Sequence, residues 1–168
     1  MVFQEGSGAL QHLGLVDQDA TGTRGILVDK PQVLERARPF LERQGVADRC
    51  ALSPGDLFAP PPRADLYLLA SVLHDWDDTH AARILAALGR SASRDSRLRI
   101  FEMLLPADAT PHRAKMSDVL MLLMFDGARE RTLGHYRALL EDTGWQLEQV
   151  VASPGPMSII QARRLATS

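Results

Sequence analysis

Short apolar runs of strand length alternate with segments of helical apolar spacing along most of the chain. Runs that indicate strands occupy 25–29, 49–52, 66–69, 98–102, 145–152 and 158–162. Apolar residues recur at helical spacing over 31–45, 81–88, 114–124 and 133–142. This alternation is typical of an α/β domain in which helical crossovers join the parallel strands of one sheet and cover both of its faces.

Turn and capping residues mark the ends of several of these elements. Ser153-Pro154-Gly155-Pro156 separates the last two strands, and such a turn fits an antiparallel pair at the end of an otherwise parallel sheet. Pro31 is placed in a first helical turn, and Thr132 is placed to cap the helix over 133–142. Gly144 ends that helix.

Composition narrows the class of protein. With 168 residues, of which 45% are hydrophobic, the chain can bury one ordinary core, so we expect a single domain over 1–168. The formal net charge of −2 gives no general attraction to nucleic acid or to an anionic membrane. Cys50 is the single cysteine, and no apolar run reaches membrane-spanning length. With no recognisable secretory signal, we expect a cytoplasmic protein that binds small molecules or protein partners.

The stretch 65–78 carries the most informative chemistry. The apolar run 66–69 is followed by His74 and three nearby aspartates. Ligands of open α/β sheets bind at the carboxyl ends of the strands, so a histidine there is placed for chemistry. A loop histidine beside aspartates is also often a solvated group, and position alone favours that interpretation. A capped helix follows this histidine, and a strand, a histidine loop and a capped helix in succession favour a functional role for His74.

Acidic residues follow three other strand candidates. They are Asp29, Asp56 and Glu102. Because parallel strands bring their carboxyl ends to one edge of the sheet, these acids and His74 can line one crevice. Each acid alone is better explained as a cap or a turn residue, whereas the set of them favours a site.

Residues 114–124 are apolar on most helical faces and rich in methionine. We favour a place in the core for this helix. The alternative is that Met121 and Met124 form walls of a pocket for a flat organic ligand. No cysteine and histidine spacing suggests a metal site, so no metal is expected. Gly6-Ser7-Gly8 lacks the lysine and hydroxyl residue of a phosphate-binding loop.

Several motifs together resemble a known family. They are Gly-Asp-Leu-Phe at 55–58, His-Asp-Trp-Asp-Asp at 74–78, Glu102 before Pro106, and Asp118 through Gly127 to Glu130-Arg131-Thr132. In order and spacing they resemble the catalytic domain of the S-adenosylmethionine-dependent small-molecule O-methyltransferases. The bacterial enzymes that methylate aromatic polyketides and other antibiotic scaffolds are the most similar, followed by the plant phenolic enzymes. The resemblance runs from about Gly6 onward and implies a Rossmann-like methyltransferase sheet.

The resemblance also implies roles for single residues. His74 would be the general base that takes the proton from a hydroxyl of an aromatic substrate, with Glu102 and Glu130 orienting it. A positioned imidazole supplies the base that a phenol needs near neutral pH. Residues implied in binding S-adenosylmethionine are Gly6, Gly8, Asp29, Asp56 and Leu57, and candidates for substrate contacts are Asp75, Met121 and Met124.

The start of the chain departs from the family pattern. Val2 stands where an aspartate is usual, and Gln4 and Glu5 occupy usual glycine positions. The first strand is therefore expected to be missing or truncated. Glycine serves there because the backbone must approach the cofactor closely, so side chains at these positions predict weaker cofactor binding.

Relatives also carry a helical N-terminal domain that builds the dimer interface and part of the substrate pocket, and nothing in this sequence corresponds to it. We therefore expect apolar surface, first of all at 114–124, to be covered by a second copy of the chain or by a partner chain.

Two hypotheses for function follow. The leading one is transfer of a methyl group from S-adenosylmethionine to an aromatic hydroxyl. The alternative is a non-methylating homologue that binds a hydrophobic ligand, assists a rearrangement or hydroxylation, or serves as a partner subunit in natural-product biosynthesis.

Overall fold

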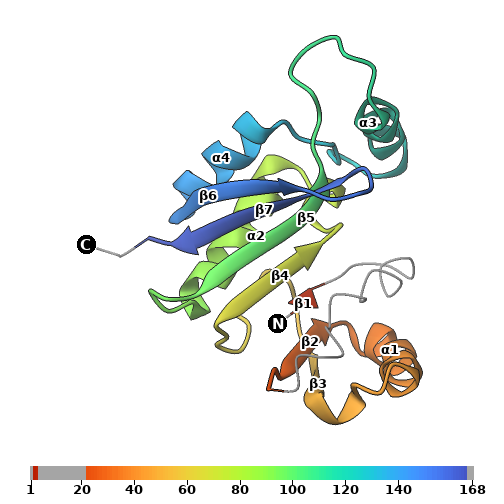
Figure 1. Cartoon of the computed structure of the whole chain (residues 1–168), viewed down its shortest axis with the longest axis vertical. Helices are drawn as coiled ribbons and strands as arrows, with labels where there is room; N and C mark the ends of the chain where they lie inside the picture. The colour runs from red at the N-terminus through yellow and green to blue at the C-terminus, as the bar shows by residue number, and fades with distance from the viewer. Residues whose placement is uncertain (1, 4–21, 166–168) are drawn as a thin grey trace.

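Seven strands form one sheet within the part of the chain that the computed structural model describes, residues 2–3 and 22–165 (Figure 1). Across the sheet they follow the order β3-β2-β1-β4-β5-β7-β6. Their bounds are β1 Val2–Phe3, β2 Gly25–Asp29, β3 Cys50–Pro54, β4 Leu66–Ala70, β5 Arg97–Met103, β6 Trp145–Ala152 and β7 Met157–Arg164. The helices described are α1 Pro31–Arg43, α2 Asp78–Ser91, α3 Arg113–Met124 and α4 Leu133–Asp142, with 3₁₀ turns at η2 Ala47–Arg49 and η3 Leu73–Asp75.

Strand directions confirm the predicted mixed sheet. The five strands β1 to β5 pair in parallel, whereas β7 runs antiparallel to both β5 and β6. The chain therefore has an antiparallel C-terminal pair on an otherwise parallel α/β sheet. The described part of β1 is Val2–Phe3, which lies between β2 and β4.

Helices cover both faces of the sheet, as two adjacent residues of β2 show. Successive side chains of a strand point to opposite faces. Leu27 packs with Leu34 and Ala37 of α1. Val28 belongs instead to the main core, where β4, β5 and β7 pack with α2 and α4. One face of the sheet is therefore covered by α1 and the other by α2 and α4.

Side-chain caps fix where two of the helices begin. At the start of α4 the Thr132 hydroxyl accepts a hydrogen bond from the amide of His135 (3.2 Å), as the sequence predicts. At the start of α2 the Asp77 carboxylate accepts one from the amide of His80 (2.8 Å). Such caps satisfy amides that have no acceptor inside the helix. The second cap fixes the end of residues 71–76, the segment that contains His74 and is called the histidine turn below, because α2 begins directly after it.

The predicted place of α3 in the core is wrong. Within this helix only Ala114 is buried, while Met116, Leu122, Leu123 and Met124 are between 62% and 77% exposed. The sheet faces are already covered by the other helices, and Figure 1 shows α3 at the end of the molecule opposite α1. The expectation of open apolar surface at 114–124 describes this helix better. Among the described residues, no helix combines the length and apolar character that crossing a membrane requires.

Candidate active site

His74 lies in a tight turn directly after β4. The strand is anchored by Tyr67 and Leu69, both fully buried. Ser71 then adopts a φ of 53°, which is uncommon for a residue with a side chain, and turns the chain away from the strand direction. The 3₁₀ turn η3 follows and contains His74. The strand therefore delivers the imidazole to the carboxyl edge of the sheet, as the sequence predicts.

Glu102, near the end of β5, holds this turn. The side chain is fully buried, and its Oε1 accepts hydrogen bonds from the amides of Val72 (3.1 Å) and Leu73 (2.9 Å). Its Oε2 lies 3.0 Å from Nδ1 of His74, close enough for an ion pair. Because two amides fix the carboxylate, its second oxygen has a defined position against the imidazole.

Glu130 reaches the same ring nitrogen from the loop after α3. Its Oε1 lies 3.7 Å from Nδ1 of His74 and accepts a hydrogen bond from the Ser117 hydroxyl (2.7 Å). The amide of Glu130 donates to the Asp118 carboxylate (2.8 Å). Burial raises the pKa of Glu130, and the nearby charges of Glu102 and Asp118 act in the same direction. In the sequence, Asp118 stood out only as part of a motif, and no signal marked Ser117 as a partner of the site.

The pKa of His74 reflects a balance between burial and charge. Burial alone would lower it, but the neighbouring acids, Glu102 first and then Asp75 and Glu130, raise it from 6.5 to about 9. Asp75 Oδ1 lies 3.4 Å from Nε2, so each ring nitrogen has a carboxylate nearby. The imidazole side chain is 16% exposed. In the free protein the ring is therefore protonated at neutral pH.

Part of the charged loop 126–132 is buried against the histidine turn. Gly127 has a φ of 76°, and a Cβ at this position would lie 2.9 Å from Cβ of Asp77. Only glycine allows this conformation and this close approach. Two residues later the amide of Arg129 donates to the carbonyl of His74 (2.9 Å). Next in sequence come the buried Glu130 and a fully buried Arg131, whose contacts the sequence did not predict.

Two of the predicted cofactor residues lie at the same edge of the sheet, on neighbouring strands. Asp29 ends β2 and is buried, and Asp56 follows β3 and accepts a hydrogen bond from the amide of Phe58 (2.9 Å). Leu57 packs against the main core. Gly6 and Gly8 lie outside the described residues.

This set of groups fits S-adenosylmethionine in its chemistry. Carboxylates at the ends of β2 and β3 can accept hydrogen bonds from ribose hydroxyls and from an adenine amine. Trp76 contacts Phe58 edge to face, with ring centroids 5.0 Å apart. The indole N–H of Trp76 is buried and has no hydrogen-bond acceptor in the described part of the chain. A buried donor of this kind favours a polar partner from outside the chain.

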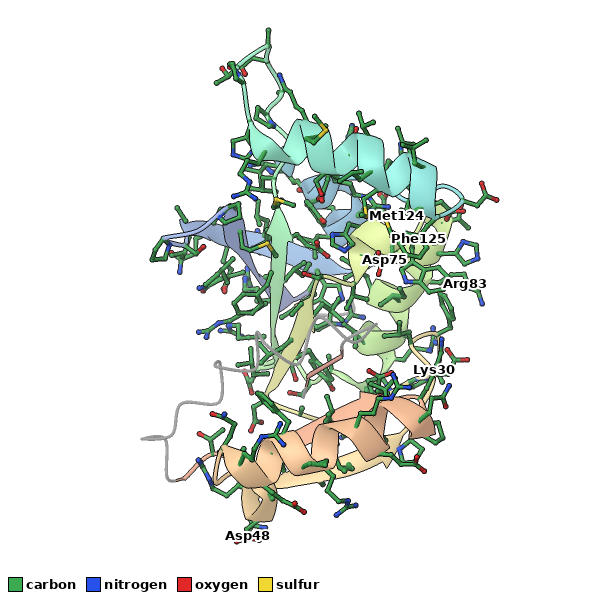
Figure 2. All side chains as sticks on the ribbon, turned by 90° about the vertical axis from the view of Figure 1, so that its right-hand side faces the viewer. Lys30, Asp48, Asp75, Arg83, Met124 and Phe125 are labelled. Carbon is green, nitrogen blue, oxygen red and sulfur yellow. The ribbon has the colours of Figure 1, made fainter. Side chains whose placement is uncertain are left out.

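Of the candidate substrate residues, Asp75 lies in the histidine turn, and Met121 and Met124 lie on α3. Asp75 is in η3 itself. Met124 ends α3 and is largely exposed, whereas Met121 is partly buried. Figure 2 shows Asp75 below Met124 and Phe125, at the C-terminal end of α3.

The three central groups also have a spacing that can hold a metal ion. Ligand atoms of His74, Glu102 and Glu130 lie within 4.8 Å of one another. A protonated imidazole offsets the charge of one of these two carboxylates, and the same carboxylates raise the pKa of His74.

Comparisons with known proteins agree on one family. A model of the O-methyltransferase domain matches residues 5–146. The mitomycin biosynthesis 6-O-methyltransferase of Streptomyces lavendulae is 40% identical over 145 residues, which cover 85% of this chain and 41% of the relative. The crystal structure of LaPhzM matches with a TM-score of 0.88 and 35% identity over 98% of this chain and 49% of that one. CalO1, a methyltransferase in calicheamicin biosynthesis in its SAH-bound form, matches with a TM-score of 0.84 and 29% identity over 97% of this chain and 48% of that one.

The chain therefore belongs to the O-methyltransferase domain family, as the motifs predict. The domain model covers most of the sequence, and the likeness in fold extends over nearly all of it. The chain spans less than half the length of the mitomycin relative and about half the length of the two solved structures.

Proposed function

We propose that this chain carries the catalytic part of an S-adenosylmethionine-dependent O-methyltransferase that methylates a hydroxyl group of an aromatic small molecule. The observation that carries the proposal is the placement of His74 among Glu102, Glu130 and Asp75 at the carboxyl edge of the sheet. The names of the mitomycin and calicheamicin relatives support an acceptor from natural-product biosynthesis.

His74 would take the proton of the acceptor hydroxyl on Nε2. When Nδ1 carries the hydrogen and faces Glu102, the neutral ring has its free electron pair on Nε2. Once Nε2 is protonated, the ring is an imidazolium. Its Nδ1 lies 3.0 Å from Oε2 of Glu102 and 3.7 Å from Oε1 of Glu130, and both carboxylates stabilise the charge. S-adenosylmethionine, when bound, supplies an electrophilic methyl group on a sulfonium. The positions of Asp29 at the end of β2 and of Asp56 just after β3 suit the binding of its nucleoside end.

The raised pKa of His74 places a condition on this chemistry. A ring with a pKa of about 9 already holds its proton at neutral pH and cannot accept another. A second positive charge near the ring disfavours the imidazolium and lowers its pKa. We therefore expect the pKa of His74 to fall when the sulfonium binds, and to fall less with the uncharged S-adenosylhomocysteine. Titration of the ring by NMR with each compound checks this expectation, and equal shifts would contradict it.

The exposed face of α3 would be covered in the working protein by a second copy of the chain or by a partner chain. This face includes Val119, Leu120, Leu122, Leu123, Met124 and Phe125. Apolar surface of this kind is typical of interaction sites. Because α3 also supplies Ser117, which binds Glu130, the covering chain would lie close to the site of the acceptor.

Two measurements test the proposed function. Isothermal titration calorimetry measures binding of S-adenosylmethionine to the chain and to Asp29→Asn, which should bind at least about tenfold more weakly after losing a charged acceptor. Mass spectrometry then follows methyl transfer to a panel of phenols. His74→Gln should lose about 10²- to 10⁴-fold in rate with unchanged cofactor binding. A chain that never binds the cofactor supports the non-methylating alternative, and an unchanged rate in His74→Gln excludes the base role.

A further inference from the structure

Arg131 is a fully buried cation whose three hydrogen bonds all reach the segment around His74. Nη1 donates to the carbonyl of Leu73 (2.5 Å), Nη2 to the carbonyl of Trp76 (2.6 Å) and Nε to the Asp78 carboxylate (2.9 Å). The two carbonyls lie on either side of His74 in the sequence. One planar guanidinium therefore spans the turn that carries the imidazole.

The backbone of Arg131 is fixed as well. Its carbonyl accepts a hydrogen bond from the amide of Leu105 (2.9 Å), and it forms a parallel bridge with Leu104 just beyond β5. The guanidinium thus extends from the edge of the same strand that supplies Glu102. Both groups have a common and rigid base in the sheet.

Glu102 and Arg131 bind complementary parts of the turn. Glu102 accepts from the amides of Val72 and Leu73, whereas Arg131 donates to the carbonyls of Leu73 and Trp76. Carrying a charge into the interior is costly unless each donor finds an acceptor. Three of the five N–H donors of Arg131 have acceptors here, and the flat fork that reaches them is a geometry that lysine does not have.

The neighbours of Arg131 link it to the ring itself. Arg129 donates its amide to the carbonyl of His74, and the side chain of Glu130 lies 3.7 Å from the ring. A shift of Arg131 would therefore move two further contacts of His74. The charged groups that face the ring are Asp75 from η3, Glu102 from β5 and Glu130 from this loop.

We propose that Arg131 is a positioning residue, which holds the imidazole of His74 against Glu102 and thereby sets the rate of proton transfer. The inference rests on the proposed role of His74 as the base. Arg131 itself touches no reacting atom, so its influence is geometric. A displacement of a catalytic group by about 1 Å can cost about 10²-fold in rate.

Arg131→Lys separates position from charge, because it keeps the cation and loses the fork. Long-range ¹H–¹⁵N NMR of the ring nitrogens should show the pKa of His74 falling toward 6.5 as its contact with Glu102 loosens. The kcat for methyl transfer should fall about 10- to 100-fold with KM changed less than about twofold. Circular dichroism melts establish that the variant is folded.

Arg164→Lys is the matched control. Arg164 also donates its guanidinium to backbone carbonyls, those of Thr143 and Gly144, but at the junction of α4 and β6. Its replacement should leave the ring signals and kcat unchanged. Should Arg131→Lys fail to fold, Asp78→Asn, which weakens the Nε contact of Arg131 together with the ion pair between Asp78 and Arg129, is expected to shift the ring signals in the same direction by a smaller amount.

Three results would overturn the inference. They are unchanged ring signals in folded Arg131→Lys, equal changes in Arg164→Lys, and, where Asp78→Asn has to decide, no change in that variant. The NMR readout needs no turnover. If the wild-type chain transfers no methyl group, the proposed function fails while the ring signals still decide whether Arg131 positions His74.

Discussion

The histidine turn and α3 both contact Glu130 but are built in opposite ways. The turn is at least partly buried, and hydrogen bonds to Glu102, Arg129 and Arg131 fix its backbone. The helix has one buried residue and exposes most of its large apolar side chains. The groups that would handle the proton are thus held by this chain alone. In contrast, α3 still has apolar surface that another chain can bury.

Replacing Glu102 should have the largest effect, because its carboxylate holds both the backbone of the histidine turn and the imidazole. Glu102→Gln keeps the size of the side chain but removes the charge beside Nδ1 of His74. We expect methyl transfer to fall about 10³-fold, or ~4 kcal/mol of transition-state stabilisation, and the pKa of His74 to fall. Steady-state kinetics and NMR titration measure the two effects. Glu141→Gln, on the exposed side of α4, is the control, and equal rates in the two variants would contradict the role of Glu102.

The stability of the folded turn should depend on pH through His74. Its folded pKa of about 9 exceeds the unfolded value of 6.5, so its contribution is full below pH 6.5 and is lost as the pH rises through 9. At 1.36 kcal/mol per pKa unit, the loss amounts to at most ~3 kcal/mol.

Urea unfolding at both ends of this range measures the effect. The difference in free energy of unfolding between wild type and His74→Gln should shrink as the pH rises from 6.5 to about 10. His135→Gln, on the exposed face of α4, is the control for a general effect of losing a histidine. A difference for His74→Gln that stays constant with pH would show that the ring is not held as described.

A substitution at Gly127 tests how closely the loop 126–132 packs against Asp77, which follows the histidine turn. Gly127→Ala introduces a Cβ 2.9 Å from that of Asp77 and demands a positive φ, so we expect a loss of about 2 kcal/mol in the free energy of unfolding. Gly134→Ala is the matched control, because it lies in α4 with only ordinary contact at the new methyl, and should stabilise by about 0.5–1 kcal/mol. Equal effects on the melting temperature would disprove the close seating.

Charge on α3 should affect folding least. Leu123, the most exposed apolar residue of the helix, can become glutamate at a cost below about 0.5 kcal/mol in the free energy of unfolding. Self-association, measured by analytical ultracentrifugation, should weaken markedly if a second copy covers the helix. Val151→Glu on β6 is the control at another exposed apolar position. Strong destabilisation of the monomer by Leu123→Glu would show that the helix is packed within the chain.

The sequence predicted most of the fold because local signals and tertiary packing agree. The helix over 133–142 and the strand over 145–152 have the predicted bounds, since Thr132 and Gly144 mark their ends. The strand predicted over 49–52 instead spans Cys50–Pro54. Pro54 pairs in register with Asp29, which is tolerated because β3 is an edge strand.

The sequence was less informative where distant parts of the chain meet. His74 and Glu102 were expected together and do meet, because neighbouring parallel strands end at one edge of the sheet. Glu130, which the resemblance placed with them, reaches His74 from the loop after α3. The burial of Arg131 was missed because an arginine among charged loop residues resembles a solvated one, and its carbonyl acceptors lie 55 and 58 residues away. The position of α3 was wrong because apolar composition does not reveal whether a surface is left to pack against.

Ser117 and Asp118 bind Glu130 from α3, the helix with the open apolar face. A protein that settles on that face would restrain the acid next to the imidazole, so assembly and acid–base behaviour would be thermodynamically linked. Reciprocity then demands that the protonation state of the histidine alter the affinity for whatever covers the helix.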